Sequence, residues 1–396
     1  MSDVAPAPAP PVTLPPIETG DEAIDALFRE AWASMPDHPS ALIESGRHIM
    51  ERSEATGNVS GRAHALAIIG YGHYLLSEHE PALEVLTEAL AQIEPMGDLY
   101  LRGMVLGALA SVHVSLGHFE QAMEAGLAAL DAARVLGDRE REAWNLVGLG
   151  NSYLDLGDLD RAMQVGEEAL GLFADLEHLP GQARAHGVIG GALKQMGRLD
   201  EARAHHEAAL RMARESQVQI NEARALHDLG ECAYARGDFD EALAFHRDAL
   251  SIRRAIGNRQ AQSTSLIHSG RTLTALGRAD EAVETLHNAR EIAVSCGAEP
   301  RIAQADEALA DAYEASGDAA LALEHFRLYH ARREAMLDAQ SRSRIHSVLI
   351  KSEAEQARQE AEIAHLRSVE LAEALHDLQQ TQRRLIQQER LASMGR

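Results

Sequence analysis

The sequence AWNLVGLGNSYLDLGDLDRAMQVGEEALGLF, residues 143–173, decides the fold, because its pattern returns every 40 residues along the chain. It predicts two amphipathic helices that are separated at Gly157. The alanine of the second helix recurs at Ala82, Ala122, Ala162, Ala202, Ala242, Ala282 and Ala322. The glycine between the helices recurs at Gly117, Gly157, Gly197, Gly237, Gly277 and Gly317, and Ser77 takes its place in the first copy. A fixed period of this length predicts a solenoid in which each helix pair buries its apolar face against its neighbours.

The helix pairs begin near residues 61, 101, 141, 181, 221, 261 and 301. In the third pair the first helix is expected to end at Leu156, with Gly157 as a left-handed cap. Asp158 or Asp160 is then expected to cap the second helix. A small residue in the first helix, at Gly70, Ala110, Gly150, Gly190, Gly230, Gly270 and Ala310, predicts a close approach of the two helices.

This pattern resembles the tetratricopeptide repeat family in a 40-residue form, over residues 61–335. The resemblance rests on the small residue, the Gly-Asp-x-Asp/Glu-x-Ala turn, and Tyr153 or Tyr313 three places after the small residue. It implies an all-α, right-handed superhelical solenoid of about seven helix pairs, with a concave face lined by the first helices. Residues 21–60 are expected to form a degenerate capping pair, and the Pro/Ala-rich residues 1–20 a disordered tail.

The composition excludes several classes of function. The formal net charge is −24, and residues 341–396 carry 9 Lys+Arg and 8 Asp+Glu, so the acidity belongs to the repeats. Such a surface repels phosphates and argues against nucleic-acid binding. The two cysteines fall in different repeats, which indicates a reducing cytoplasm. No apolar run predicts a membrane span or a signal peptide, so we expect a cytoplasmic protein with no membrane contact.

Residues 336–396 predict a long helix that continues the array. Alternating spacings of 4 and 3 residues, typical of a coiled-coil seam, join Leu371, Leu375, Leu378, Gln382 and Leu385. We therefore expect a parallel homodimer whose seam is weakened at Gln382. The alternative is a single helix folded back on the array.

The final residues, QQERLASMGR, resemble the segment that leads into the dimerisation and phosphoacceptor helix of bacterial histidine kinases. In that family the phosphoaccepting histidine would lie beyond Arg396. The resemblance implies a sensory module that relays binding through the coiled coil to a histidine kinase output in two-component signal transduction. The catalytic domain would then be absent from residues 1–396.

Three other outputs remain open. The array could instead feed a diguanylate cyclase, and a Gly-Gly-Asp/Glu-Glu-Phe turn downstream would indicate that output. It could be a free-standing scaffold or adaptor that ends at Arg396. It could also be a peptide-responsive regulator resembling quorum-sensing repeat proteins, although residues 1–60 offer no basic helix-turn-helix for DNA.

The sequence predicts no catalytic site, cofactor or metal centre. The Gly-rich stretch GLGNSYLDLG lacks the spacing of a phosphate loop, and no HExxH motif or Cys/His cluster occurs. The 20 histidines are interpreted as surface or groove residues.

The first helices offer the best candidate binding site, a groove for a peptide or protein ligand. Counting from the small residue, the groove-facing positions hold Trp144, Asn151, Arg184, Lys194, Arg224, His227, Glu231, Tyr234 and Arg271. The four cations gather positive charge on one face of an acidic protein. In related arrays an Asn at the position of Asn151 binds a peptide backbone, and basic residues nearby hold a carboxylate.

Two features leave this interpretation open. The second Asn of a full carboxylate clamp is missing, because Gly191 and Glu231 hold those places. The arginines could instead pair with Glu231 and Asp155 on a solvated face. Trp144 and Tyr234 could grip an apolar side chain, or they could be ordinary packing between repeats.

Overall fold

The computed structural model describes residues 19–34, 39–76 and 78–337. The chain divides into a unit of residues 1–336 and a second unit of residues 337–396. The predicted N-terminal tail up to residue 18, Ser77 and the whole predicted dimer seam lie outside the described residues. The elements that are described are all helical, which confirms the predicted all-α solenoid.

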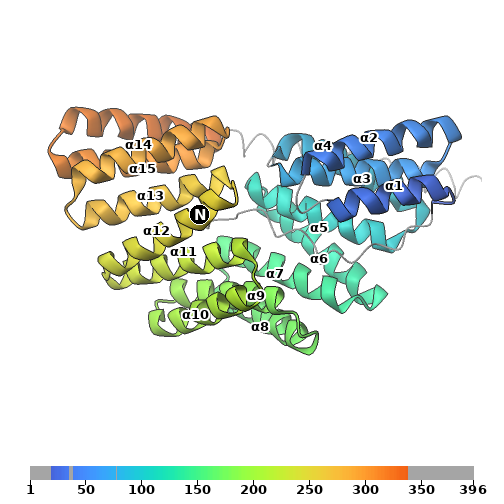
Figure 1. Cartoon of the computed structure of the whole chain (residues 1–396), viewed down its shortest axis with the longest axis horizontal. Helices are drawn as coiled ribbons and strands as arrows, with labels where there is room; N and C mark the ends of the chain where they lie inside the picture. The colour runs from blue at the N-terminus through green and yellow to red at the C-terminus, as the bar shows by residue number, and fades with distance from the viewer. Residues whose placement is uncertain (1–18, 35–38, 77, 338–396) are drawn as a thin grey trace, which may run out of the picture. The chain divides into compact units, whose positions relative to one another are not determined.

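The helices follow the 40-residue period (Figure 1). The first helices of the seven pairs, called A helices below, are α3 (Val59–Leu75), α5 (Leu99–Ser115), α7 (Arg139–Leu156), α9 (Leu179–Gln195), α11 (Gln219–Arg236), α13 (Arg259–Ala275) and α15 (Glu299–Ser316). The second helices, called B helices, are α4 (His79–Ile93), α6 (Phe119–Leu136), α8 (Leu159–Asp175), α10 (Leu199–Glu215), α12 (Phe239–Ala255), α14 (Ala279–Ser295) and residues 319–337. A short 3-10 helix, η1 (Glu94–Met96), follows α4.

Each A helix packs against the B helices on either side and also contacts the A helix of the next repeat. The A helices therefore form one continuous face. Two further helices, α1 (Glu22–Ser34) and α2 (Pro39–Thr56), precede the array at the place of the expected capping pair. No helix within the described ranges is long and apolar enough to cross a membrane.

The small residues act as expected at the contacts between helices. The alanine series is fully buried or nearly so from Ala82 to Ala282, whereas Ala322 in the last described helix is only half-buried. A Cβ on Gly70 would lie 2.6 Å from the Leu86 side chain, and one on Gly270 would lie 2.4 Å from Leu286. Close helix contact thus depends on these residues.

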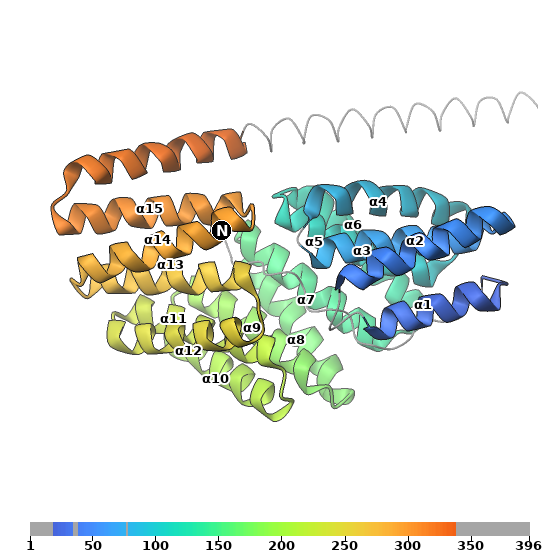
Figure 2. The ribbon, with the colours of Figure 1, turned by 45° about the horizontal axis from the view of Figure 1, so that its top comes forward.

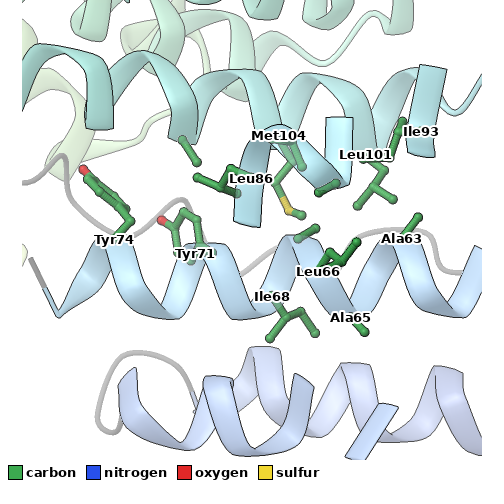
Figure 3. Close-up of a cluster of buried hydrophobic side chains, with 14 of the residues drawn as sticks. Ala63, Ala65, Leu66, Ile68, Tyr71, Tyr74, Leu86, Ile93, Leu101 and Met104 are labelled. Atoms are coloured by element: carbon green, nitrogen blue, oxygen red, sulfur yellow. The ribbon is translucent and has the colours of Figure 1, made fainter. Parts of the chain in front are cut away.

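The cluster at the N-terminal end of the array illustrates this packing (Figure 3). Leu86 and Met104 come from α4 and α5 and point toward α3, where Leu66 and Tyr71 lie opposite them. The buried side chains interdigitate across three successive helices, so each repeat completes the core of its neighbour.

The turns between helices use left-handed backbone. Gly157 has φ 76°, and the Asp158 side chain accepts a hydrogen bond from the backbone N–H of Arg161, so both predicted caps are confirmed. A second series closes α2 and the B helices, at Gly57, Gly97, Gly137, Gly257 and Gly297. Glu177 and Gln217 occupy the same place in two repeats, with φ 53° and 58°.

We predict that Glu177→Gly and Gln217→Gly each stabilise the protein. The left-handed conformation costs a residue with a Cβ roughly 1–2 kcal/mol, and glycine avoids this cost. Glycine loses more conformational entropy on folding, which offsets part of the gain in stability. The expected net increase in the free energy of unfolding is about 0.5–1 kcal/mol per site, measured as a shift of the urea midpoint. Gly257→Ala is the matched control and should shift the midpoint the other way. A lower midpoint for either glycine variant would contradict the argument.

The last repeat contains a buried carboxylate that joins three helices. Asp306 on α15 is fully buried, and its Oδ1 accepts a hydrogen bond from Arg290 Nε of α14 at 2.7 Å. His325 Nδ1 lies 3.0 Å from the same oxygen, and Arg332 Nε lies 3.3 Å from Oδ2. His325 and Arg332 belong to the helix of residues 319–337, which Figure 2 shows following α15. Asp306 therefore fastens this helix to the array.

Asp306→Ala is expected to lower the free energy of unfolding by roughly 2–4 kcal/mol. It would leave two guanidinium groups without their buried partner, although both reach solvent in part. Glu307→Gln removes the neighbouring half-buried pair with Arg271, which still reaches solvent, and should cost under about 1 kcal/mol. Urea unfolding followed by circular dichroism measures both. Equal losses would show that Asp306 is no anchor.

Candidate functional site

Two arginines at equivalent repeat positions form what we call the basic pair, Arg184 on α9 and Arg224 on α11. Arg184 is only 5% exposed, and its Nε is buried with no hydrogen-bond partner. Arg224 is half-buried. Among the described residues, no carboxylate makes an ion pair with either guanidinium. A buried cation without a partner is costly, so this position favours an incoming anion.

Electrostatics support this interpretation. Burial holds the pKa of Arg184 well below its ordinary value, and the charge of Arg224 lowers the pKa further, while Asp228 acts in the opposite direction. Because an arginine nevertheless stays protonated in proteins, the positive charge of Arg184 needs a nearby anion. The Tyr74 phenol of α3 has a smaller effect and raises this pKa.

The other two predicted cations already have partners. Lys194 Nζ lies 3.5 Å from Glu231 Oε2 on the next A helix, and Arg271 Nη2 lies 2.7 Å from Glu307 Oε2. Burial alone would lower the pKa of Lys194, but Glu231 and Asp228 raise it. The predicted four-residue basic face is thus reduced to the basic pair.

The remaining predicted groove residues make local contacts. Asn151 Nδ2 donates a hydrogen bond to the Val147 carbonyl of its own helix at 3.1 Å. Trp144 packs edge-on against Phe173, with ring centroids 5.0 Å apart. Tyr234 packs against Phe239 at the start of α12. Both aromatic contacts lie within a single repeat, so the roles proposed for Trp144 and Tyr234 stay predictions.

A second group of polar residues lies beside the basic pair, and we call it the histidine cluster: His227 and Glu231 on α11, His246 on α12 and His268 on α13. Glu231 Oε1 lies 2.5 Å from His268 Nδ1 and 3.8 Å from His246 Nε2. The ring of His227 stands perpendicular to that of His268, with centroids 4.7 Å apart. His246 is fully buried.

The charges of the histidine cluster depend on one another. Burial would raise the pKa of Glu231, but His268, Lys194 and His227 together hold it well below its ordinary value. Burial lowers the pKa of His246, and His227 and His268 lower it further. Glu231 is therefore an anion that interacts with several cationic or polar neighbours at once.

His246 and His268 were missed by the sequence analysis. The cluster draws on three helices, and no local motif brings such residues together. One signal was present: His246 stands at the repeat position of Leu86 and Leu286, where a core residue is expected. A Cβ on Gly230 would lie 2.5 Å from its ring. His206 occupies the same position one repeat earlier.

Two further histidines meet within one repeat. His186 on α9 and His205 on α10 share a hydrogen bond between their Nδ1 atoms at 2.9 Å, in which one ring donates and the other accepts. This bond requires that at least one ring is neutral. Burial, together with the charges of His205, Arg211 and His206, lowers the pKa of His186 from 6.5 to about 4.

Stability is expected to fall as the pH drops from 6.5 toward 4. In this range the unfolded chain binds a proton at His186 that the folded chain does not bind, so acid favours unfolding. Because the ring is only partly buried, the expected loss between pH 7.5 and 5 is roughly 1 kcal/mol. His186→Asn should reduce the difference in urea midpoint between these pH values. His48→Asn, on an exposed face of α2, should leave the difference unchanged, and an unchanged difference in the His186 variant would refute the assignment.

Comparison with known proteins identifies the repeats. Residues 100–175 and 181–255 match the family model of the tetratricopeptide repeat. A comparison with curated proteins finds no match.

Several solved structures are similar in fold. A Rap protein complexed with competence and sporulation factor is 18% identical, with coverage of 80% of this chain and 89% of that one and a TM-score of 0.63. The Rap conjugation gene regulator of the plasmid pLS20, in complex with the Phr* peptide, is 12% identical, with coverage of 72% and 77% and a TM-score of 0.59. A signal transduction ATPase with a tetratricopeptide repeat sensor from Pyrococcus horikoshii is 15% identical, with coverage of 81% and 49% and a TM-score of 0.55. Residues 100–175 and 181–255 are therefore tetratricopeptide repeats, and they lie within an all-α repeat solenoid.

Proposed function

We propose that the face of the A helices binds a peptide or protein segment through a carboxylate, and that the basic pair receives this carboxylate. The observation that carries the proposal is the buried guanidinium of Arg184, whose Nε has no partner and whose neighbour is a second cation. Guanidinium groups bind carboxylates through two parallel hydrogen bonds, which gives both affinity and orientation. The chain itself would not catalyse a reaction.

A peptide is favoured over a small anion because the A helices form a face several repeats long. Two of the structures with a similar fold are complexes, one with competence and sporulation factor and one with the Phr* peptide. Those ligands belong to those proteins. They support the proposal only by indicating that a solenoid of this kind can accommodate a peptide.

The second step of the proposal is a relay through the C-terminal end. Asp306 fastens the helix of residues 319–337 to α14 and α15, so a movement of the last repeats would move this helix. We propose that residues 336–396 then form a homodimeric coiled coil that passes the movement to a histidine kinase output. The resemblance of QQERLASMGR to the kinase segment supports this output.

Binding should depend on a peptide carboxylate and on the basic pair. We expect affinity selection from short random peptides with free C-terminal carboxylates to retain ligands. Amidation of a selected peptide should weaken its binding at least 10-fold, as should Arg224→Gln. Arg184→Glu with Arg224→Glu should abolish binding without loss of helicity in circular dichroism.

The control is Arg62→Gln, which removes one positive charge from an exposed ion pair on α3 and should change binding less than twofold. Selected peptides that bind the doubly reversed variant as tightly as the wild type would refute the assignment of the basic pair. If the free-acid and amidated libraries bind equally, the carboxylate has no role.

The output is tested by the reading frame that follows Arg396. A helical His-Glu pair about ten residues on, followed by an ATP-binding domain, would support the histidine kinase. A Gly-Gly-Asp/Glu-Glu-Phe turn would indicate the diguanylate cyclase, and an immediate stop codon would indicate the free-standing adaptor. The proposed peptide site is independent of this outcome.

A further inference from the structure

We propose that Glu231, His246 and His268 form a binding site for a divalent transition-metal ion of the zinc class. Each of the three offers one ligand atom, and these atoms lie within 4.8 Å of one another. Within the described parts of the chain they are the one group of histidine, cysteine and carboxylate side chains with this property. Two imidazole nitrogens and one carboxylate oxygen are a common donor set for Zn²⁺, with a fourth position left for water.

The first argument is the position of His246. Its side chain is fully buried, and neither ring nitrogen has a hydrogen-bond partner. An unpartnered buried polar atom is costly, because the water it has lost is not replaced. Leu86 and Leu286 fill the same repeat position with apolar side chains, so packing alone does not require an imidazole. A metal ion at Nε2 would satisfy one of its two nitrogens.

The second argument is that three side chains present ligand atoms to one point. His206 occupies the equivalent position one repeat earlier, and its nitrogens are also buried and unpartnered. Its nearest carboxylate oxygen is Asp228 Oδ2 at 3.9 Å, and no three-residue donor group forms around it. A buried histidine is therefore not sufficient for a site. What distinguishes His246 is that Glu231 and His268 present ligand atoms to it.

The third argument is how Glu231 divides its two oxygens. Oε2 faces Lys194 at 3.5 Å, whereas Oε1 faces His268 at 2.5 Å and His246 at 3.8 Å. The imidazole side of the carboxylate is thus free of the ammonium group. Zn²⁺ with bonds of about 2.0–2.1 Å needs its ligand atoms roughly 3.3 Å apart. The 2.5 Å separation is a hydrogen bond between His268 Nδ1 and Glu231 Oε1 that a bound ion would replace, and the 3.8 Å separation from His246 Nε2 would have to shorten. His227 stands against the His268 ring and orients it.

The site would couple two repeats. Its ligands come from α11 and α12 of one repeat and from α13 of the next, so a bound ion would resist their separation. An ion that binds the folded state only raises stability according to its concentration relative to its Kd.

The test uses the full chain without a histidine tag, freed of metal by a chelator and titrated with ZnCl2. We expect one equivalent to bind with a micromolar or lower Kd in calorimetry, and the Tm to rise on addition of Zn²⁺. His246→Leu introduces the leucine that stands at this repeat position as Leu86 and Leu286, and the variant should fold without metal. It should weaken binding at least 10-fold and remove the rise in Tm, and Glu231→Gln should do the same.

His206→Leu is the matched control, because it makes the same substitution at the same repeat position outside the site. It should bind Zn²⁺ with the wild-type stoichiometry and affinity. Absence of stoichiometric binding by the wild type would overturn the proposal. So would a His246→Leu variant that binds as the wild type does, or an equal loss in the two leucine variants. None of these results bears on the basic pair.

Discussion

The architecture of this molecule depends above all on the short distance between the two helices of a repeat. At Gly70 and Gly270 the space where a Cβ would stand is filled by a leucine of the B helix. At Gly190 and Gly230 the same space is filled by His206 and His246, so the requirement for a small residue recurs along the array. The buried alanine series meets the requirement from the other helix. The face of the A helices is a consequence of this packing, since each A helix also contacts the A helix of the next repeat.

The same position shows how function can enter a repeat. Where His246 replaces leucine opposite Gly230, the fold is kept but a polar ring lies in the core. Such a substitution exchanges apolar contact for nitrogen atoms that need a partner. The neighbouring helices provide Glu231 and His268 at that point. A solenoid tolerates this exchange because each repeat contacts only its neighbours, so a local cost does not spread through the array.

The sequence was sufficient for the helix pairs and for the turn inside a repeat, which depend on residues close together in the chain. Gly157 could be assigned as a cap, and the second cap narrowed to Asp158 or Asp160, because a cap depends on its own turn. Glu177 and Gln217 show that the left-handed turn persists even where glycine is absent. Counting along the repeats placed Arg184 and Lys194 on the A helices. It could not show which of the two would form an ion pair. Pairing depends on side chains about one repeat away, whose rotamers follow from packing that the period does not encode.

The unpaired state of Arg184 follows from where the nearby carboxylates are committed. Glu231 pairs with Lys194 and His268, and Glu307 pairs with Arg271. Asp228 attracts Arg184 without reaching ion-pair distance, while Arg224 repels it. In a protein with a net charge of −24, an arginine without a carboxylate partner is not explained by a shortage of anions. It is explained by a local arrangement in which other cations hold the carboxylates, and this leaves one buried guanidinium to be balanced by a group that the described residues do not supply.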